Sequence, residues 1–190
     1  MSYQNDIFFS YKRDPQTDDW YHQVEAKIRL WVGLELGYEP KIWVDRRSIQ
    51  AGTKHTPEIR SALKQSRVMV SFWSPLYFRS LWCMTEWKTF LHRGEKYATP
   101  LVLPASVHDG DTFPDEARDT QYHKFNDFFK SCPIFWKEQG ALQFEDQLKA
   151  FSMRLAQMIM QSPPFEDFDV IEAGASDLQP VPPIGRIADV

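Results

Sequence analysis

The chain lacks a long apolar run, is poor in cysteine and carries no excess of basic residues. No apolar stretch approaches the roughly 18 residues that a membrane span needs, and the polar start at 1–6 shows no signal peptide. Two cysteines, Cys83 and Cys132, can form neither a disulfide framework nor the usual four-ligand zinc site. The net charge of −4 argues against general nucleic-acid binding, which rests on basic surfaces. We therefore expect a cytoplasmic protein that binds neither membrane nor nucleic acid directly.

Familiar phosphate-binding and nucleophile motifs are also missing. Neither G-x-G-x-x-G nor G-x-x-x-x-G-K-[ST] occurs, so a nucleotide would have to be held by side chains and strand-end amides. No Ser-His-Asp or Cys-His arrangement is indicated, and we expect no metal site. The histidines are scattered, and each is expected at the surface or in the core: His22, His55, His92, His108 and His123.

The composition is that of one globular domain with a distinct end. Hydrophobic residues make up 43% of the 190 residues, as is usual for such domains, but the aromatic share of 15% is high and serves either a heavy core or stacking surfaces. Five of the 13 prolines and six of the 26 acidic residues follow Gln161, with one basic residue. We predict a domain at 1–161 and an acidic, proline-rich tail or linker at 162–190, either disordered or docked on a neighbouring subunit.

Short apolar runs alternate with helical patterns along the chain. The runs predict strands at 7–9, 41–44, 68–72 and 100–104. Apolar spacings of three and four predict helices over 20–37, from 57, over 74–93 and over 143–160, with a short aromatic helix around 125–129. Such alternation predicts an α/β fold, a flavodoxin-like or Rossmann-like three-layer sandwich with a parallel sheet of about five strands.

In such folds, ligands collect at the carboxyl ends of the strands. Here those ends are followed by Ser10–Arg13, by Asp45–Thr53 and by the turn from Phe72 into the helix that carries Glu86. Three separate segments are therefore expected to converge on one crevice.

The same segments resemble the TIR domain family. Asp6–Tyr11, with the sequence DIFFSY, looks like the family's first box, in which a strand ends in Ser-Tyr. Trp43–Gly52 looks like the second strand and the loop after it. Ser74-Pro75 followed by Ser80–Glu86, SLWCMTE, looks like the helix that bears the catalytic Glu, and its Trp-Cys-x-x-Glu element is the most specific part. The resemblance covers roughly residues 4–160, in the correct order.

This resemblance implies an enzyme that takes NAD+ as its substrate and needs no cofactor. Some TIR domains only assemble, and others consume NAD+; many animal signalling adaptors lack a Glu at the position of Glu86. The chain resembles stand-alone bacterial immune effectors, such as Thoeris-type antiphage proteins, or the TIR part of a longer immune protein. The products would be nicotinamide with ADP-ribose, a cyclic ADP-ribose isomer or a conjugate.

Cleavage of the bond between ribose and nicotinamide develops positive charge at the anomeric carbon, which a nearby carboxylate stabilises. The nicotinamide ring is already a cationic pyridinium in the substrate and leaves as neutral nicotinamide, so no general acid is required and Glu86 alone could suffice. Trp82 lies four residues earlier on the same helical face, where it either walls the ribose side or packs in the core. Cys83 is interpreted as a packing residue.

The strand-end residues supply the expected binding groups. Ser10, Tyr11 and Arg13 either hold ribose hydroxyls and phosphates or cap the strand. Asp45 either binds substrate or fixes its loop through backbone amides. Arg47 and Ser48 meet phosphate, a neighbouring subunit or only solvent.

The resemblance further implies self-association through TIR–TIR contacts, activity in the oligomer, and a sensor or effector partner from the same defence system. Two other functions remain open. One is a non-enzymatic scaffold in which Glu86 is incidental. The other is an enzyme like the nucleoside deoxyribosyltransferases, which also place a Glu on a Rossmann-like sandwich.

Overall fold

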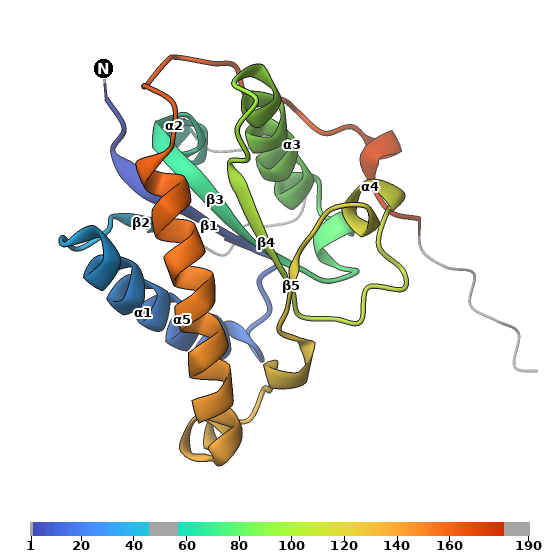
Figure 1. Ribbon diagram of the computed structural model, residues 1–190. Helices are drawn as coiled ribbons and strands as arrows, with labels where there is room; N and C mark the ends of the chain where they lie inside the picture. The colour runs from blue at the N-terminus through green and yellow to red at the C-terminus, as the bar shows by residue number, and fades with distance from the viewer. Residues whose placement is uncertain (1, 46–56, 181–190) are drawn as a thin grey trace, which may run out of the picture.

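A computed structural model describes residues 2–45 and 57–180, and in these residues five strands form one parallel sheet (Figure 1). The strands lie side by side in the order β2-β1-β3-β4-β5, which is the flavodoxin-like order. The predicted fold class is therefore confirmed. The strands are β1 (Asn5–Tyr11), β2 (Ile42–Val44), β3 (Ser66–Trp73), β4 (Val102–Ser106) and β5 (His123–Lys124).

Helices cover both faces of this sheet (Figure 1). Helices α1 (Asp18–Leu36) and α5 (Gln139–Met160) pack together on one face, and α2 (Pro57–Gln65) and α3 (Leu81–Lys96) cover the other. The remaining helical segments are short: α4 (Asp115–Arg118) and the 3-10 turns η1 (Tyr77–Arg79), η2 (Asn126–Phe128), η3 (Pro133–Lys137) and η4 (Ala175–Asp177). No helix among the described residues is both long and apolar enough to span a membrane.

Aromatic side chains fill both halves of the core. Side chains alternate along β1, so Phe8 lies on the face covered by α3 and Phe9 on the opposite face. The Phe8 ring stacks on Trp43 of β2, with 4.6 Å between ring centroids, and packs against Phe90 of α3. The Phe9 ring packs against Phe72 of β3. The largest fully buried side chains are all aromatic: Trp20, Trp73, Trp87, Tyr77, Phe8, Phe72, Phe78, Phe90, Phe113, Phe125, Phe144 and Phe151. The high aromatic content thus serves packing, because each such ring removes roughly 150–250 Å² from water.

Several element boundaries differ from the predictions, for local reasons. Helix α3 begins at Leu81 and not at Ser74, because η1 intervenes and Ser80, in extended conformation, caps the helix by accepting from the Cys83 amide. Gly94 lies inside α3 and does not end it. A Cβ at Gly94 would lie 2.9 Å from the Thr99 carbonyl oxygen, so the glycine allows the chain to return closely after the helix.

Other differences are smaller. The predicted aromatic helix around 125–129 is the single 3-10 turn η2, and α5 begins four residues before the predicted position. Strand β5 was not predicted individually, since two residues are too few to show a period. Gly37 does end α1, in the left-handed conformation (φ 74°) that a glycine adopts without strain.

The segment after α5 lies against its own domain. Residues 162–180 run across α2 and α3 (Figure 1), whereas the sequence predicted a tail or linker, disordered or docked on another subunit. The Ile171 and Ala173 amides donate to the Thr89 and Thr85 hydroxyls at 3.0 and 2.9 Å. Acidic side chains of the segment pair with basic ones on the two helices: Lys64–Asp167, Lys88–Asp177, Lys96–Glu166 and Arg60–Glu172. We call residues 162–180 the C-terminal strap.

Candidate functional site

The end of β1 meets α3 through a hydrogen bond between two buried side chains. Ser10 Oγ donates to Glu86 Oε2 at 2.5 Å, and the two residues are only 2% and 7% exposed. The contact follows from local periodicity: β1 alternates, so Ser10 shares the face of Phe8 towards α3, and Glu86 lies in the second turn of that helix. The predicted convergence of the first and third segments is therefore observed.

Ser10 has a second partner that the sequence did not predict. The Tyr77 hydroxyl lies 3.1 Å from Ser10 Oγ, and Tyr77 is completely buried. It belongs to η1, a turn held by the backbone bond from the Tyr77 amide to the Ser74 carbonyl. In the sequence, Tyr77 is one large apolar residue among others between the end of a strand and the start of a capped helix, and only its hydroxyl group distinguishes it from its neighbours Leu76 and Phe78.

Burial dominates the electrostatics of Glu86. Loss of solvation raises the pKa of Glu86 to about 8; the hydrogen bond from Ser10 opposes this shift, and the negative charge of Asp45 adds to it. At neutral pH the free protein therefore holds this carboxyl mainly protonated. Burial also raises the pKa of the neighbouring Cys83 thiol to about 12, so Cys83 is an unreactive packing residue, as predicted.

Glu86 differs in its pairing from the other buried glutamate of the described chain. Glu25, which is 6% exposed, is bonded to the guanidinium of Arg29 at 2.6 Å. Within residues 2–45 and 57–180, Glu86 has no cationic partner and relies on the neutral Ser10 hydroxyl. A buried acid without a counter-charge is destabilising, and such arrangements concentrate at functional sites.

The remaining strand-end residues divide between the two faces. Asp45 directly follows β2, and its charge acts on both Glu86 and Arg13. Arg13 pairs with Asp18 at 3.0 Å, and its other terminal nitrogen is buried without a hydrogen-bond partner in the described chain. Tyr11 stacks on Tyr21 of α1 at 4.0 Å, on the opposite face of β1 from Ser10, so its ring is not brought to Glu86.

Trp82 lies one turn before Glu86 on α3 and is partly buried against the core. Its contact with substrate stays a prediction, as do the binding roles of Ser10, Tyr11, Arg13 and Asp45. Arg47 and Ser48 lie outside the described residues. Among the residues that the structure describes, no cluster of three His, Cys, Asp or Glu side chains could hold a metal ion.

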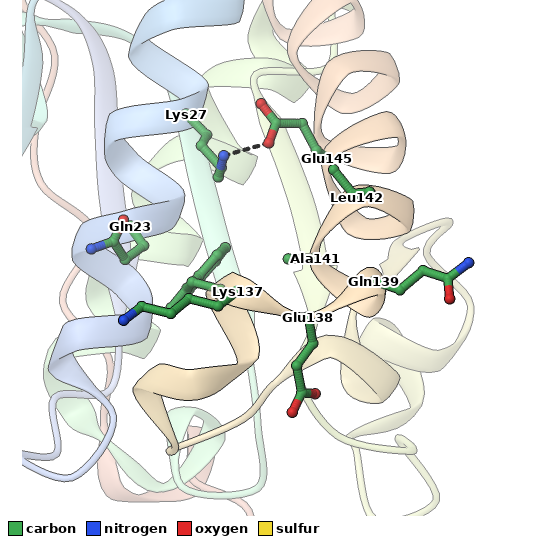
Figure 2. Close-up of a pocket in the computed structure, with 9 residues that line it drawn as sticks. Gln23, Lys27, Lys137, Glu138, Gln139, Ala141, Leu142 and Glu145 are labelled. Atoms are coloured by element: carbon green, nitrogen blue, oxygen red, sulfur yellow. Dashed lines mark hydrogen bonds and ion pairs between the residues drawn. The ribbon is translucent and has the colours of Figure 1, made fainter.

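A separate surface pocket of about 470 Å³ lies between α1 and the start of α5 (Figure 2). Lys27 and Glu145 form an ion pair across it at 2.5 Å, and Trp136 lines it. Because α1 and α5 cover the opposite face of the sheet from α3, this pocket is distinct from the strand-end site.

The parallel sheet in flavodoxin order makes this an α/β domain of the class that binds ligands at the carboxyl ends of its strands, and the buried Ser–Glu pair lies at that edge. The model of the TIR domain family matches residues 7–133, more than half of the chain. The chain belongs to the TIR domain family.

Solved TIR domains also match this chain. One set is the TIR domains of the activated Roq1 resistosome that directly recognises the pathogen effector XopQ, with 18% identity over 84% of this chain and 86% of that chain and a TM-score of 0.42. Another is the TIR domain of the Toll-related receptor TRR-2 of Hydra magnipapillata, with 19% identity over 75% of this chain and 99% of that chain and a TM-score of 0.44. No curated protein matches the sequence.

Proposed function

We propose that this TIR domain cleaves the bond between nicotinamide and ribose in NAD+, with Glu86 as its catalytic residue. The observation that carries the proposal is the buried Ser10–Glu86 pair at the carboxyl edge of the sheet, where the acid has no cationic partner in the described chain. A glutamate with only a packing role would be expected to be paired, as Glu25 is with Arg29. A cationic substrate can supply a counter-charge that residues 2–45 and 57–180 do not.

The nicotinamide ring of NAD+ carries that positive charge. Its approach favours the ionised form of Glu86, because an opposite charge within a few ångströms stabilises a carboxylate. The carboxylate then stabilises the positive charge that develops on the ribose as nicotinamide leaves. Water, or a nucleophile from the same molecule, completes the reaction and gives ADP-ribose or a cyclic isomer.

Burial of Glu86 in the single chain also supports activation by assembly. The carboxyl is 7% exposed and closed off by Ser10, so a substrate needs some rearrangement to reach it. We propose that TIR–TIR contacts supply this rearrangement, in a bacterial defence setting such as the stand-alone effectors have. Specific activity should then fall on dilution; a value that does not change across the dilution series contradicts activation by assembly.

The decisive experiment measures nicotinamide release from NAD+ by the purified chain at high concentration. Glu86→Gln should lower the rate by roughly 100-fold or more, the usual effect of removing one charge-stabilising group. Glu95→Gln is the matched control, since Glu95 is exposed near the end of the same helix. Release that survives Glu86→Gln refutes the role of Glu86. An assembled but inactive wild-type chain indicates a scaffold, and turnover of deoxynucleosides with NAD+ ignored indicates a transferase.

A further inference from the structure

Tyr77 places a hydroxyl group in a largely aromatic part of the core. The residue is 0% exposed, its ring packs on Phe78 at 5.4 Å between centroids, and its hydroxyl lies 3.1 Å from Ser10 Oγ. A phenylalanine would fill nearly the same volume without a buried polar atom. Because a buried hydroxyl is costly unless it is hydrogen-bonded, its partner indicates what it is for.

The direction of this bond follows from counting protons. A serine hydroxyl carries one proton, and Ser10 gives it to Glu86 Oε2 when the acid is ionised. In its bond with Tyr77, Ser10 can then only accept, and the phenol keeps its proton because burial raises the pKa of Tyr77 well above its ordinary value. The Ser71 hydroxyl is a second neighbour of the phenol and, like Ser10, opposes that rise in pKa. The resulting chain runs from Tyr77 through Ser10 to Glu86 and links η1, β1 and α3.

We propose that Tyr77 is a positioning residue for Glu86, holding the Ser10 hydroxyl so that its proton points at the carboxylate. This inference rests on the proposed function, since it concerns the form of Glu86 that the reaction uses. A hydroxyl that accepts one bond donates a stronger one, and fixing its rotation removes the orientations that leave Glu86 without a donor. Tyr77 therefore supports the ionised acid without touching the substrate.

Other groups around Glu86 act in different directions. Asp45, after β2, disfavours ionisation of Glu86 through its negative charge. Cys83, on α3 itself, remains a neutral thiol, and Lys12, after β1, acts on Cys83. In the described chain, the Tyr77–Ser10 pair is thus the hydrogen-bonded support of the carboxylate.

The test is a side-chain carbon NMR titration of Glu86 in the 190-residue chain, with the signal assigned by its loss in Glu86→Gln. Tyr77→Phe should raise the midpoint by about half a pH unit, the size expected from weakening one hydrogen bond, and Ser10→Ala should raise it further. Adding Tyr77→Phe to Ser10→Ala should not move the midpoint further, because Ser10→Ala already removes the hydroxyl through which Tyr77 acts on Glu86. Tyr38→Phe, which removes a hydroxyl bonded to Asp6, is the control and should leave the midpoint unchanged.

A midpoint that Tyr77→Phe leaves in place, or an effect that simply adds to that of Ser10→Ala, overturns the proposal and assigns Tyr77 to packing. The titration needs no turnover, so it stands apart from the test of the reaction. If the wild-type chain releases no nicotinamide while the midpoint moves as expected, the proposed function fails and the hydrogen-bond chain remains. If nicotinamide is released, the acid limb of kcat/KM against pH should move with the NMR midpoint.

Discussion

Ser10 and Glu86 are separated by 76 positions in the sequence, yet Ser10 Oγ donates a 2.5 Å hydrogen bond to Glu86 Oε2 in the interior of the domain. The bond satisfies the acid but supplies no counter-charge. The free protein therefore carries a carboxyl that is easier to protonate than to ionise.

The first prediction concerns stability against pH. The pKa of Glu86 is raised from 4.5 to about 8 in the folded chain, so folding retains a proton that the unfolded chain loses over that interval. The contribution of Glu86 is therefore fully present below about pH 4.5 and is lost as pH rises towards 8. Glu86→Gln, which cannot ionise, should be more stable than wild type by roughly a few kcal/mol at the upper end of the interval.

Urea unfolding of both proteins at several pH values between 5 and 8.5 checks this. Glu95→Gln serves as the control, because Glu95 is exposed on the same helix. A difference between wild type and Glu86→Gln that stays constant across the series contradicts the burial argument.

The second prediction concerns proton release on binding. An NAD+ analogue whose nicotinamide ribose has carbon in place of its ring oxygen keeps the cationic ring but cannot be cleaved. At pH 7 its binding should release up to one proton, because the ring charge ionises Glu86. Calorimetry in buffers of different ionisation enthalpy measures that number. Equal release from wild type and Glu86→Gln would assign the proton to another group.

The third prediction concerns the C-terminal strap. Deleting 162–190 removes the amide donors to Thr85 and Thr89 and the ring of Phe168 over the Arg93 guanidinium. The melting temperature should fall by several degrees, roughly the effect of losing a few kcal/mol in a domain of this size. The ion pairs contribute less, since exposed pairs are screened by solvent.

Deleting only 181–190 is the matched control for this truncation, because it leaves every strap contact named above in place. Thermal unfolding of the two truncated chains beside the full chain makes the comparison. A chain ending at Gln161 that melts with the full chain would mean that the strap contacts add nothing to stability.

The fourth prediction concerns thiol reactivity. Cys83 is buried, and that burial raises the pKa of its thiol to about 12, whereas Cys132 is exposed. Native protein at pH 7.5 should react rapidly with one equivalent of a thiol reagent, and Cys132→Ser should react slowly. Mass spectrometry of the labelled peptides identifies the site. Rapid labelling of Cys83 would show that the region around Glu86 opens readily.

Much of the site could be predicted from local patterns. The apolar run before Ser10 indicates a strand that ends there, and the Trp82–Glu86 spacing indicates one helical face; parallel topology then brings strand ends together. Tyr77 could not be predicted, because its partner is distant in sequence and its local context is that of a turn. Ser74-Pro75 and Ser80 are both plausible helix starts, and the predicted start of α3 is wrong because Ser74 Oγ accepts from the Tyr77 amide and begins only the turn η1, whereas Ser80 caps α3.

For the C-terminal strap, too, local sequence predicts the character of the segment but not its contacts. Proline, acidic residues and few large aliphatics predict a segment that buries little surface of its own. Its docking depends on basic side chains of α2 and α3 and on the hydroxyls of Thr85 and Thr89, which come together only after the sheet is covered.

The sequence by itself determined the α/β class, the aromatic content of the core, and the placement of Ser10 and Glu86 at the carboxyl edge of the sheet. These features depend on periodicity and chain order, which are local properties. Only the tertiary structure decided that Glu86 has no cationic partner in the described chain, that the Tyr77 hydroxyl contacts Ser10 Oγ, and that residues 162–180 lie on α2 and α3. Burial and pairing are properties of the assembled surroundings, so a residue's neighbours along the chain do not reveal them.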